Sequence, residues 1–333
     1  MRTMELQQFG DHGLKLVERP LLEPGPGQVR VRMRACSLNF RDYLMVLGQY
    51  NPRQPLPLVP LSDGVGTIEA LGPGVTRWQV GQRVLGLFMQ DWEDGLPTPE
   101  KLKTSLGGPL DGMLQEQAIL SERGIAQVPD YLTDLQAATL PCAALTAWTA
   151  LVTHGHLAAG ETVVIQGTGG VSLFALQIAV LMGARPIVLS SSEEKLARAR
   201  QMGAWQTLNY REEPAWGKKI LAMTGGVDHV VEVGGGQTFG QSLQCARVGG
   251  HVAVIGILSG AQTTTALTPI LMKNLQVQGV MVGNATGMRQ MLRAFESAKI
   301  QPVVERVLPW TDAQEALAEL AQGRHFGKVG LVF

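Results

Sequence analysis

The stretch Glu161 to Gly203, ETVVIQGTGGVSLFALQIAVLMGARPIVLSSSEEKLARARQMG, decides the fold of this chain. It holds an apolar run at Val163 to Ile165, a glycine-rich turn, an apolar helical segment that ends near Gly183, and a second run at Pro186 to Leu189. This order predicts a strand, a helix and a second strand. Glycines between a strand and a helix let backbone N–H groups approach a phosphate, and the helix dipole adds partial positive charge. The stretch therefore predicts a turn that binds a pyrophosphate.

The glycine pattern of this turn departs from Gly-x-Gly-x-x-Gly at one position. Ser172 stands where the third glycine would allow helix and strand to pack closely, and serine is small enough to fit there. Such glycines also occur in tight turns that bind no ligand. The spacing to the second strand and the strand–helix alternation downstream favour the dinucleotide-binding interpretation.

The composition excludes several classes of protein. The chain has 333 residues, which favours two domains, and 45% hydrophobic residues supply apolar material for two cores. Lys plus Arg equals Asp plus Glu at 28 each, so there is no basic field to attract nucleic acid or an anionic membrane. The start, MRTMELQQFG, does not resemble a signal peptide, and the three cysteines lie far apart. We expect a cytoplasmic protein with reduced thiols.

The chain changes character at about residue 130. Residues 1–128 are β-rich with Gly- and Pro-rich turns, and the polar segment Gln90 to Gly108 predicts a surface loop. Strands and helices alternate from about Thr133. We expect an α/β fold in which residues 131–283 form a doubly wound parallel Rossmann sheet. Residues 1–130 and 284–333 are expected to form a β-rich, partly rolled-up domain, which the tail re-enters.

The alternating segment predicts six strands and five helices of the Rossmann sheet. The strands are Thr162 to Gln166, Pro186 to Ser190, Gln206 to Asn209, His229 to Val233, His251 to Ile257 and Val277 to Val282. The helices are Val171 to Met182, Lys195 to Met202, Ala215 to Met223, Phe239 to Ala246 and Ile270 to Lys273. The tail adds two amphipathic helices and strands at Val303 to Leu308 and Lys328 to Phe333.

The end of the second Rossmann strand indicates the cofactor. NAD-binding sites usually carry Asp or Glu there, which repels a 2′-phosphate. This chain has Ser190, Ser191 and Ser192, followed by Lys195, whose hydroxyl and ammonium groups suit a phosphate. The alternative is that Ser191 and Glu194 form a helix-capping box without any ligand. The missing acidic residue favours NADP(H) over NAD(H).

Four motifs resemble one known superfamily. They are ACSLNFRD (Ala35 to Asp42), VPLSDGVG (Val59 to Gly66), LPCAALTAWTAL (Leu140 to Leu151) and VVIQGTGGVS. In this order the chain resembles the medium-chain dehydrogenase/reductase superfamily, and within it the zinc-independent quinone oxidoreductase branch. The resemblance implies a GroES-like catalytic domain beside the Rossmann domain. It also implies a homodimer that pairs the edge strands near Gln276 to Val282.

The same resemblance allows a test for catalytic zinc. Asn39 stands where zinc-dependent relatives have a ligand cysteine, and Ser62 stands where they have a ligand histidine. Cys142 alone falls on a family ligand position, the third. Amide and hydroxyl groups are poor replacements for thiolate and imidazole. We therefore expect no metal and interpret Cys142 as a small packing residue. His154 and His156 are interpreted as loop residues.

Without a metal, alcohol oxidation lacks its usual electrophile. Quinones and α,β-unsaturated carbonyls accept hydride at an electron-poor carbon, so the predicted reaction is hydride transfer to them from the nicotinamide C4. A zinc-free alcohol or aldehyde reductase remains an alternative, as does a non-catalytic NADPH-binding sensor. The substrate is expected to be a small molecule in each enzyme reading.

Two catalytic candidates follow from the resemblance. The Asn39 amide suits a hydrogen bond to a nicotinamide ribose hydroxyl or to the substrate oxygen, and the alternative is a turn asparagine. Tyr50, in the segment LGQY, suits proton relay or stacking on the acceptor, and the alternative is packing. Asp42 is expected to orient the backbone or Arg41 rather than act as a base.

The cofactor-binding candidates share positions in the turn or at strand ends of the predicted sheet. They are Thr146, Gly167, Thr168, Gly169, Gly170, Val171, Ser190, Ser191, Lys195, Tyr210, Val233, Gly234, Ile255, Gly256, Ile257, Val282 and Gly283.

Overall fold

A computed structural model describes residues 1–10 and 12–333 of the chain. They form two compact units. The first contains Met1–Leu145 and Gly283–Phe333, and the second contains Thr146–Val282. Across the described residues, no helix has the length and apolar character that a membrane crossing requires.

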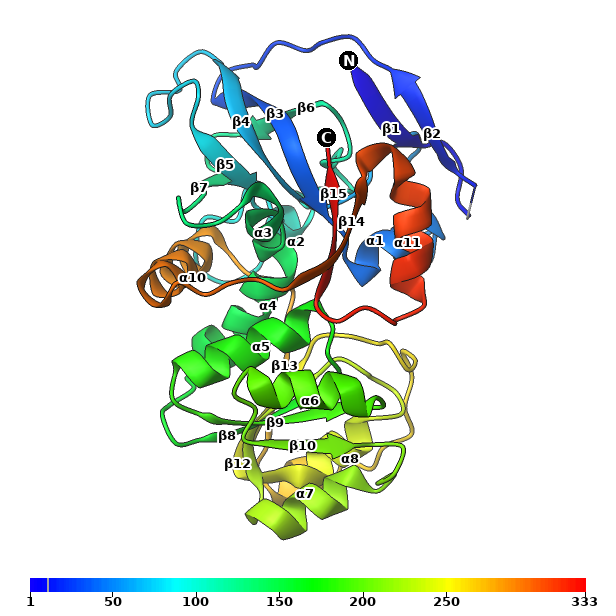
Figure 1. Cartoon of the computed structure of the whole chain (residues 1–333), viewed down its shortest axis with the longest axis vertical. Coiled ribbons are helices and arrows are strands. Elements are labelled where there is room, and N and C mark those ends of the chain that lie inside the picture. Colours follow the sequence, from blue (N-terminus) through cyan, green and yellow to red (C-terminus); the bar gives the residue numbers. More distant parts are fainter. Residues whose placement is uncertain (11) are drawn as a thin grey trace. The chain divides into compact units, whose positions relative to one another are not determined.

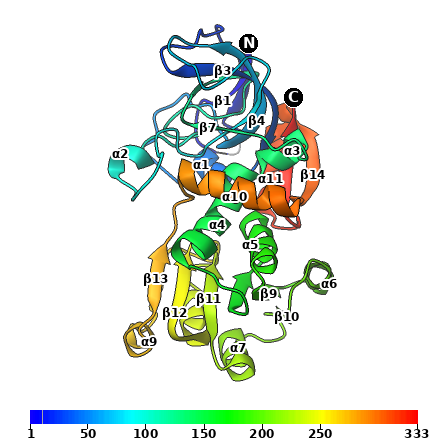
Figure 2. The ribbon, with the colours of Figure 1, turned by 90° about the vertical axis from the view of Figure 1, so that its left-hand side faces the viewer.

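The second unit is built on a six-stranded sheet in which every strand pair is parallel. The strand order is β10-β9-β8-β11-β12-β13. The strands are β8 (Thr162–Gln166), β9 (Arg185–Ser190), β10 (Gln206–Asn209), β11 (Val227–Glu232), β12 (Ala246–Val254) and β13 (Gln276–Gly279). This order confirms the predicted doubly wound Rossmann sheet, and Figure 2 shows β11, β12 and β13 side by side.

Helices cover this sheet in two sets. The helices are α4 (Leu145–Trp148), α5 (Gly170–Leu181), α6 (Glu193–Gln201), α7 (Trp216–Thr224), α8 (Phe239–Cys245) and α9 (Thr268–Met272). Helices α5 and α6 contact β8, β9 and β10, while α7 and α8 pack together over β11 (Figure 1). The order of strands reverses at β8, so right-handed crossovers place the two sets on opposite faces. Because both faces are covered, the central strands contain fully buried apolar residues such as Val164, Val230 and Val252.

The first unit is β-rich. Its seven-stranded sheet has the order β14-β15-β3-β4-β5-β7, with β6 also paired to β3. The strands are β3 (Gln28–Ser37), β4 (Asp63–Leu71), β5 (Arg83–Gly86), β6 (Gln117–Ser121), β7 (Ile125–Gln127), β14 (Val304–Pro309) and β15 (Lys328–Val332), beside the hairpin of β1 (Arg2–Leu6) and β2 (Leu14–Glu18). The helices are α1 (Phe40–Val46), α2 (Pro99–Leu102), α3 (Asp134–Ala138), α10 (Ala285–Ala298) and α11 (Ala313–Ala321).

The C-terminal strand β15 lies beside the N-terminal strand β3 in this unit (Figure 1). The two strands are antiparallel, with Gly330 opposite Ser37. The backbone N–H of Leu38 also donates to the carbonyl of Val329 at 3.0 Å. This register brings Lys328 next to Leu38 and Asn39, which follow β3 and lie 290 and 289 positions earlier in the chain.

Several sequence expectations need correction, among them the end of β13, which is Gly279 rather than Val282. The segment Gln90 to Gly108 is not a polar surface loop throughout, because it contains α2 and buried side chains at Trp92 and Leu106. The buried Gln90 amide donates to the carbonyls of Leu87 and Gly124, and these hydrogen bonds compensate for its burial. In the second unit, β12 begins at Ala246 rather than His251 and ends at Val254 rather than Ile257.

Candidate active site

The predicted catalytic residue Asn39 is the N-cap of α1, immediately after β3. Its backbone N–H donates to Asp42 Oδ2 at 2.9 Å, and Arg41 Nη1 donates to Asp42 Oδ1 at 3.2 Å. The expectation that Asp42 orients the backbone and Arg41 is confirmed. Burial raises the pKa of Asp42 above its ordinary value, and the charge of Arg41 opposes that shift.

The side chain of Asn39 belongs to a buried polar cluster with the start of β4. Asn39 Nδ2 donates to Ser62 Oγ at 3.3 Å, and Ser62 Oγ donates to Asp63 Oδ1 at 3.0 Å. The other oxygen of Asp63 accepts hydrogen bonds from Ser37 Oγ and from the backbone N–H of Cys142, each at 3.4 Å. Burial raises the pKa of Asp63 to about 6, although the charge of Lys328 and the Asn39 amide lower it.

Lys328 completes this cluster, and the sequence analysis did not select it. Its side chain is 3% exposed, and its Nζ donates to the Leu38 carbonyl at 2.5 Å and to Asn39 Oδ1 at 2.6 Å. The same nitrogen lies 3.9 Å from Asp63 Oδ2. A lysine is seldom buried unless it is paired. The position of Lys328 directly before the apolar run VGLVF was the sequence signal that could have identified it as a buried, paired residue.

The donor atoms of this cluster can be compared with those that zinc requires. Cys142 lies in a π-helical turn (Leu140–Ala144), and burial raises the pKa of its thiol well above the ordinary value. Zinc binds the thiolate. Asn39 and Ser62 offer neutral oxygen and nitrogen atoms, and a Lys328 ammonium hydrogen already occupies Asn39 Oδ1. No group of three His, Cys, Asp or Glu side chains in the described part of the chain is arranged to hold a metal ion.

Tyr50, the second catalytic candidate, is 39% exposed and follows α1. The Arg41 guanidinium carbon lies 4.8 Å from the Tyr50 ring centroid, which is a cation–π contact. Arg41 also donates to the carbonyls of Leu106, Gly107 and Gly108. Arg41 therefore positions Tyr50 beside the helix that Asn39 begins.

The glycine turn of the second unit has the form that a dinucleotide pyrophosphate requires. Gly167 has φ +75°, a conformation that favours glycine, and Gly169 is the N-cap of α5. A β-carbon at Gly169 would meet no described heavy atom within 4 Å. The first N–H groups of α5 lack helical partners, so Gly169, Gly170 and Val171 offer backbone donors to an anion. The turn fits the cofactor predicted for it.

Ser172 fits at the position of the third glycine of the turn, as its small size predicted. It is buried in the first turn of α5, and its Oγ donates to the Gln166 carbonyl at 2.7 Å. This hydrogen bond ties the helix to the end of β8 and satisfies the buried hydroxyl. The missing third glycine is therefore compatible with close packing of helix and strand.

A second buried polar network, which the sequence analysis missed, fixes the neighbouring strand end. Gln166 Oε1 accepts from the backbone N–H groups of Val233 and Gly234 at 3.2 and 3.1 Å. Glu232 Oε1 accepts from the N–H groups of Gly234 and Gly235, each at 2.8 Å, and Glu232 Oε2 accepts from Gln166 Nε2 at 2.7 Å. The signal was a glutamate at the end of an otherwise apolar strand, HVVEV.

The following strand end is joined to this one. The N–H of Ile255 donates to the Glu232 carbonyl at 2.9 Å. A β-carbon on Gly256 would lie 2.4 Å from the Val233 carbonyl oxygen, so only glycine fits there. The structure thus brings together Val233, Gly234, Ile255, Gly256 and Ile257 at the carboxyl edge of the sheet.

The residues predicted to bind the 2′-phosphate lie together at the ends of β9 and β10. Ser190 is buried, Ser191 and Lys195 are half-buried, and the exposed Tyr210 donates its N–H to the Ser190 carbonyl at 3.1 Å. The capping box of Ser191 and Glu194 is wrong. Ser192 is the N-cap of α6, because its Oγ accepts from the N–H of Lys195 at 3.3 Å.

The remaining candidates lie near the limits of the second unit. Thr146 is buried in α4. Val282 is buried and has φ +52°, an uncommon conformation for a branched residue. Gly283 is the first residue of the C-terminal segment that belongs to the first unit.

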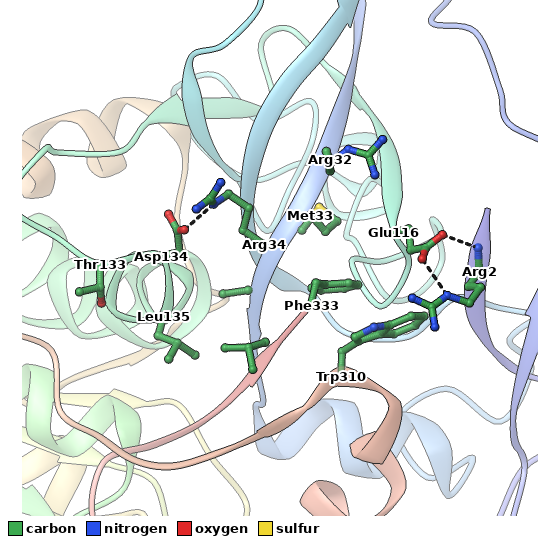
Figure 3. Close-up of a pocket in the computed structure, with 12 residues that line it drawn as sticks. Arg2, Arg32, Met33, Arg34, Glu116, Thr133, Asp134, Leu135, Trp310 and Phe333 are labelled. Atoms are coloured by element: carbon green, nitrogen blue, oxygen red, sulfur yellow. Dashed lines mark hydrogen bonds and ion pairs between the residues drawn. The ribbon is translucent and has the colours of Figure 1, made fainter.

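A hollow of about 630 Å³ in the first unit has a different lining (Figure 3). Trp310 and Phe333 stack there with ring centroids 4.8 Å apart. Arg34 pairs with Asp134 at 2.6 Å, and Arg2 pairs with Glu116 at 2.8 Å. Since these charges are already compensated and the predicted site residues lie elsewhere, this hollow is not the candidate active site.

The parallel sheet and its glycine turn are typical of a dinucleotide-binding domain, and the relatives described below identify the chain as an NAD(P)H-dependent oxidoreductase. The model of the alcohol dehydrogenase GroES-like domain matches residues 25–130, and the model of the zinc-binding dehydrogenase matches residues 170–297. The chain belongs to the medium-chain dehydrogenase/reductase superfamily, as its motifs indicated.

Relatives and solved structures agree with this family. A zinc-type alcohol dehydrogenase-like protein of Schizosaccharomyces pombe is 40% identical over 92% of this chain and 91% of its own length. A quinone oxidoreductase of Pseudomonas aeruginosa is 33% identical over 93% of this chain and 92% of its own length. The crystal structure of an NAD-dependent alcohol dehydrogenase is 33% identical, covers 100% of both chains and has a TM-score of 0.91. Other structural neighbours are complexes with NADP or NADPH.

Proposed function

We propose that the protein is a zinc-independent, NADPH-dependent reductase that transfers hydride to a quinone or an α,β-unsaturated carbonyl. The observation that carries this proposal is the cluster of Asn39, Ser62, Asp63 and Lys328. These side chains bond to one another, and a lysine ammonium lies among them. Neutral donors and a buried cation are unsuited to zinc, so the electrophile for alcohol oxidation is missing.

The residues of the chain then have the following roles. When bound, the nicotinamide supplies the hydride. The backbone of Gly167 to Val171 binds the pyrophosphate, and Ser190, Ser191 and Lys195 bind the 2′-phosphate. Asn39 donates a hydrogen bond to the oxygen of the acceptor, which stabilises the charge that develops there. Tyr50 stacks on the acceptor or relays a proton to it.

The proposal extends to the assembly and the location of the protein. We place the protein in the cytoplasm as a homodimer, with the edge of the sheet at β13 as the contact. The exposed apolar side chains beside that edge support this contact.

Two other functions are compatible with the fold. A zinc-free alcohol or aldehyde reductase is supported by the alcohol dehydrogenase-like relatives. A non-catalytic NADPH sensor would use the same cofactor turn. The quinone oxidoreductase relative and the unsuitable zinc donors favour the reductase of conjugated acceptors.

A stopped-flow assay separates these functions. Loss of NADPH absorbance is measured with quinones, enals and saturated aldehydes, and gain of NADPH absorbance is measured with alcohols and NADP⁺. The zinc content of the same preparation is measured by mass spectrometry. We expect turnover with quinones or enals and less than stoichiometric zinc. Tight NADPH binding without turnover of any acceptor would contradict the enzyme, and one zinc per chain would contradict the metal-free mechanism.

A further inference from the structure

The buried ammonium of Lys328 determines which end of the Asn39 amide can face a ligand. An ammonium group donates hydrogen bonds and accepts none. The Asn39 atom 2.6 Å from Lys328 Nζ must therefore be the carbonyl oxygen, and the amide nitrogen must lie on the other side.

The rest of the cluster favours the same orientation. The Asn39 nitrogen donates to Ser62 Oγ, and Ser62 Oγ donates onward to Asp63 Oδ1. These three hydrogen bonds thus form one series, in which Lys328 donates to Asn39, Asn39 donates to Ser62, and Ser62 donates to the Asp63 carboxylate. A flipped amide would place two donors against each other at Lys328, and it would place the amide oxygen against Ser62 Oγ, whose one hydrogen is already donated to Asp63. It would therefore lose two buried hydrogen bonds.

We propose that Lys328 is a positioning residue that holds the Asn39 amide with its oxygen inward, so that Asn39 can offer only N–H to a substrate. Asn39 is 8% exposed, so only a small part of its side chain can meet a ligand. A carbonyl oxygen needs only a donor. The hydroxyl of an alcohol also needs an acceptor for its own hydrogen, which this amide cannot provide.

The proposal rests on the reductase function, in which Asn39 contacts the acceptor oxygen. It also assigns a specificity role to Lys328: the side chain selects carbonyl compounds over the corresponding alcohols without touching either. The positive charge at Asn39 Oδ1 polarises the amide and makes its N–H a stronger donor. Arginine at this position would keep the donor-only character, whereas methionine would remove it.

The test measures equilibrium binding of cyclohexenone and cyclohexenol to the complex with NADP⁺, with absorbance followed to detect any alcohol oxidation. For the wild type we expect the ketone to bind about tenfold more tightly than the alcohol, as one well-made hydrogen bond allows. In Lys328→Met this ratio should fall to about one, and Lys328→Arg should restore most of it. Affinity for NADP⁺ should stay within about twofold, since the residues proposed to bind its pyrophosphate and 2′-phosphate lie in the other unit.

Lys328→Met leaves Asp63 without its cation, which can prevent folding. The double variant Asp63→Asn with Lys328→Met keeps the cluster neutral and should show the same loss of preference in a protein with native near-UV circular dichroism. An unchanged ratio in either folded variant, or a wild type without ketone preference, overturns the proposal. A wild type that prefers the ketone but reduces no acceptor refutes the reductase function and leaves the amide orientation supported.

Discussion

At the level of single residues, the proposed preference for NADPH rests on Lys195. Its backbone N–H donates to the Ser192 Oγ that caps α6, and the residue lies in the first turn of that helix, shortly after Ser190 and Ser191. The nearby Glu193 carboxylate accepts from Asn209 Nδ2 at 3.0 Å and lies 3.6 Å from Arg200, so its charge is partly compensated. A lysine ammonium is suited to a charge-assisted contact with a phosphate.

Lys195→Ala should weaken NADPH binding about 10- to 100-fold and change NADH binding less than about twofold, because only NADPH loses a charge-assisted contact. Fluorescence titration of both cofactors measures the two constants. Lys218→Ala, at an exposed lysine on α7, serves as the matched control and should change neither. Equal weakening of NADPH and NADH by Lys195→Ala would show that the side chain does not contact the 2′-phosphate.

His251 is a second residue with a measurable consequence. Its ring is 5% exposed, and its Nδ1 lies 3.5 Å from His229 Nδ1. His229 Nε2 lies 2.9 Å from the Glu161 carboxylate, so it carries the hydrogen and leaves His229 Nδ1 as the acceptor. His251 must then donate from Nδ1, and its buried Nε2 has no hydrogen-bond partner among the described residues. His154 and His156 also act on the charge of this ring. His154 ends a π-helical turn and is not the loop residue that the sequence predicted.

Burial, and then the neighbouring histidines, lower the pKa of His251 from 6.5 to about 4. Between these values the unfolded chain binds a proton that the folded chain does not. The folded state should therefore lose up to about 3 kcal/mol as the pH falls from 6.5 to 4. Urea unfolding at neutral pH and near pH 4 measures the loss.

His251→Gln should reduce that acid-induced loss of unfolding free energy, because glutamine does not titrate in this range. The exposed His12→Gln, in the first unit, is the control and should retain the wild-type pH dependence. If His251→Gln and the wild type lose the same unfolding free energy on acidification, the buried imidazole is not the cause.

At the level of elements, the sequence of the β8–α5–β9 segment was sufficient to predict its structure. Predicted and observed limits of β8 coincide, and α5 begins one residue before the predicted Val171. Apolar runs, a glycine turn and a helical segment are local signals, so they can be read without tertiary contacts. The resemblance to zinc-dependent relatives identified Asn39 and Ser62 as standing at the positions of metal ligands, since each of the two motifs is contiguous in the sequence.

Elements joined by long-range contacts could not be predicted in this way. Lys328 approaches Asn39 only because β15 pairs with β3, and no local pattern specifies that register. The network of Gln166 and Glu232 likewise depends on the pairing of β8 with β11. The prediction of the α6 cap was wrong for a different reason. Three consecutive serines offer equivalent caps, and the helix begins one residue later than a cap at Ser191 would require.

At the level of the whole molecule, the edge of the six-stranded sheet remains to be explained. Strand β13 pairs with β12 on one side, and its residues are exposed. Apolar side chains gather beside this edge at Leu267, Leu271 and Met272 on or next to α9, and at Val277 and Met281 on or after β13. Exposed strand edges and contiguous apolar patches are typically covered in the native assembly. A second copy pairing its own β13 would cover both at once.

Leu271→Glu should therefore convert the proposed homodimer to a monomer, because a glutamate at this 78%-exposed position would bring a charge into a desolvated interface. Light scattering coupled to size exclusion measures the mass, expected near twice 35.8 kDa for the wild type and near 35.8 kDa for the variant. Leu96→Glu, at an exposed leucine of the first unit, is the matched control and should remain dimeric. A monomeric wild type, or a dimer that survives Leu271→Glu, would contradict assembly through this edge. Because the substitution removes no packing within the protomer, cofactor affinity should persist in the monomer, which separates assembly from folding.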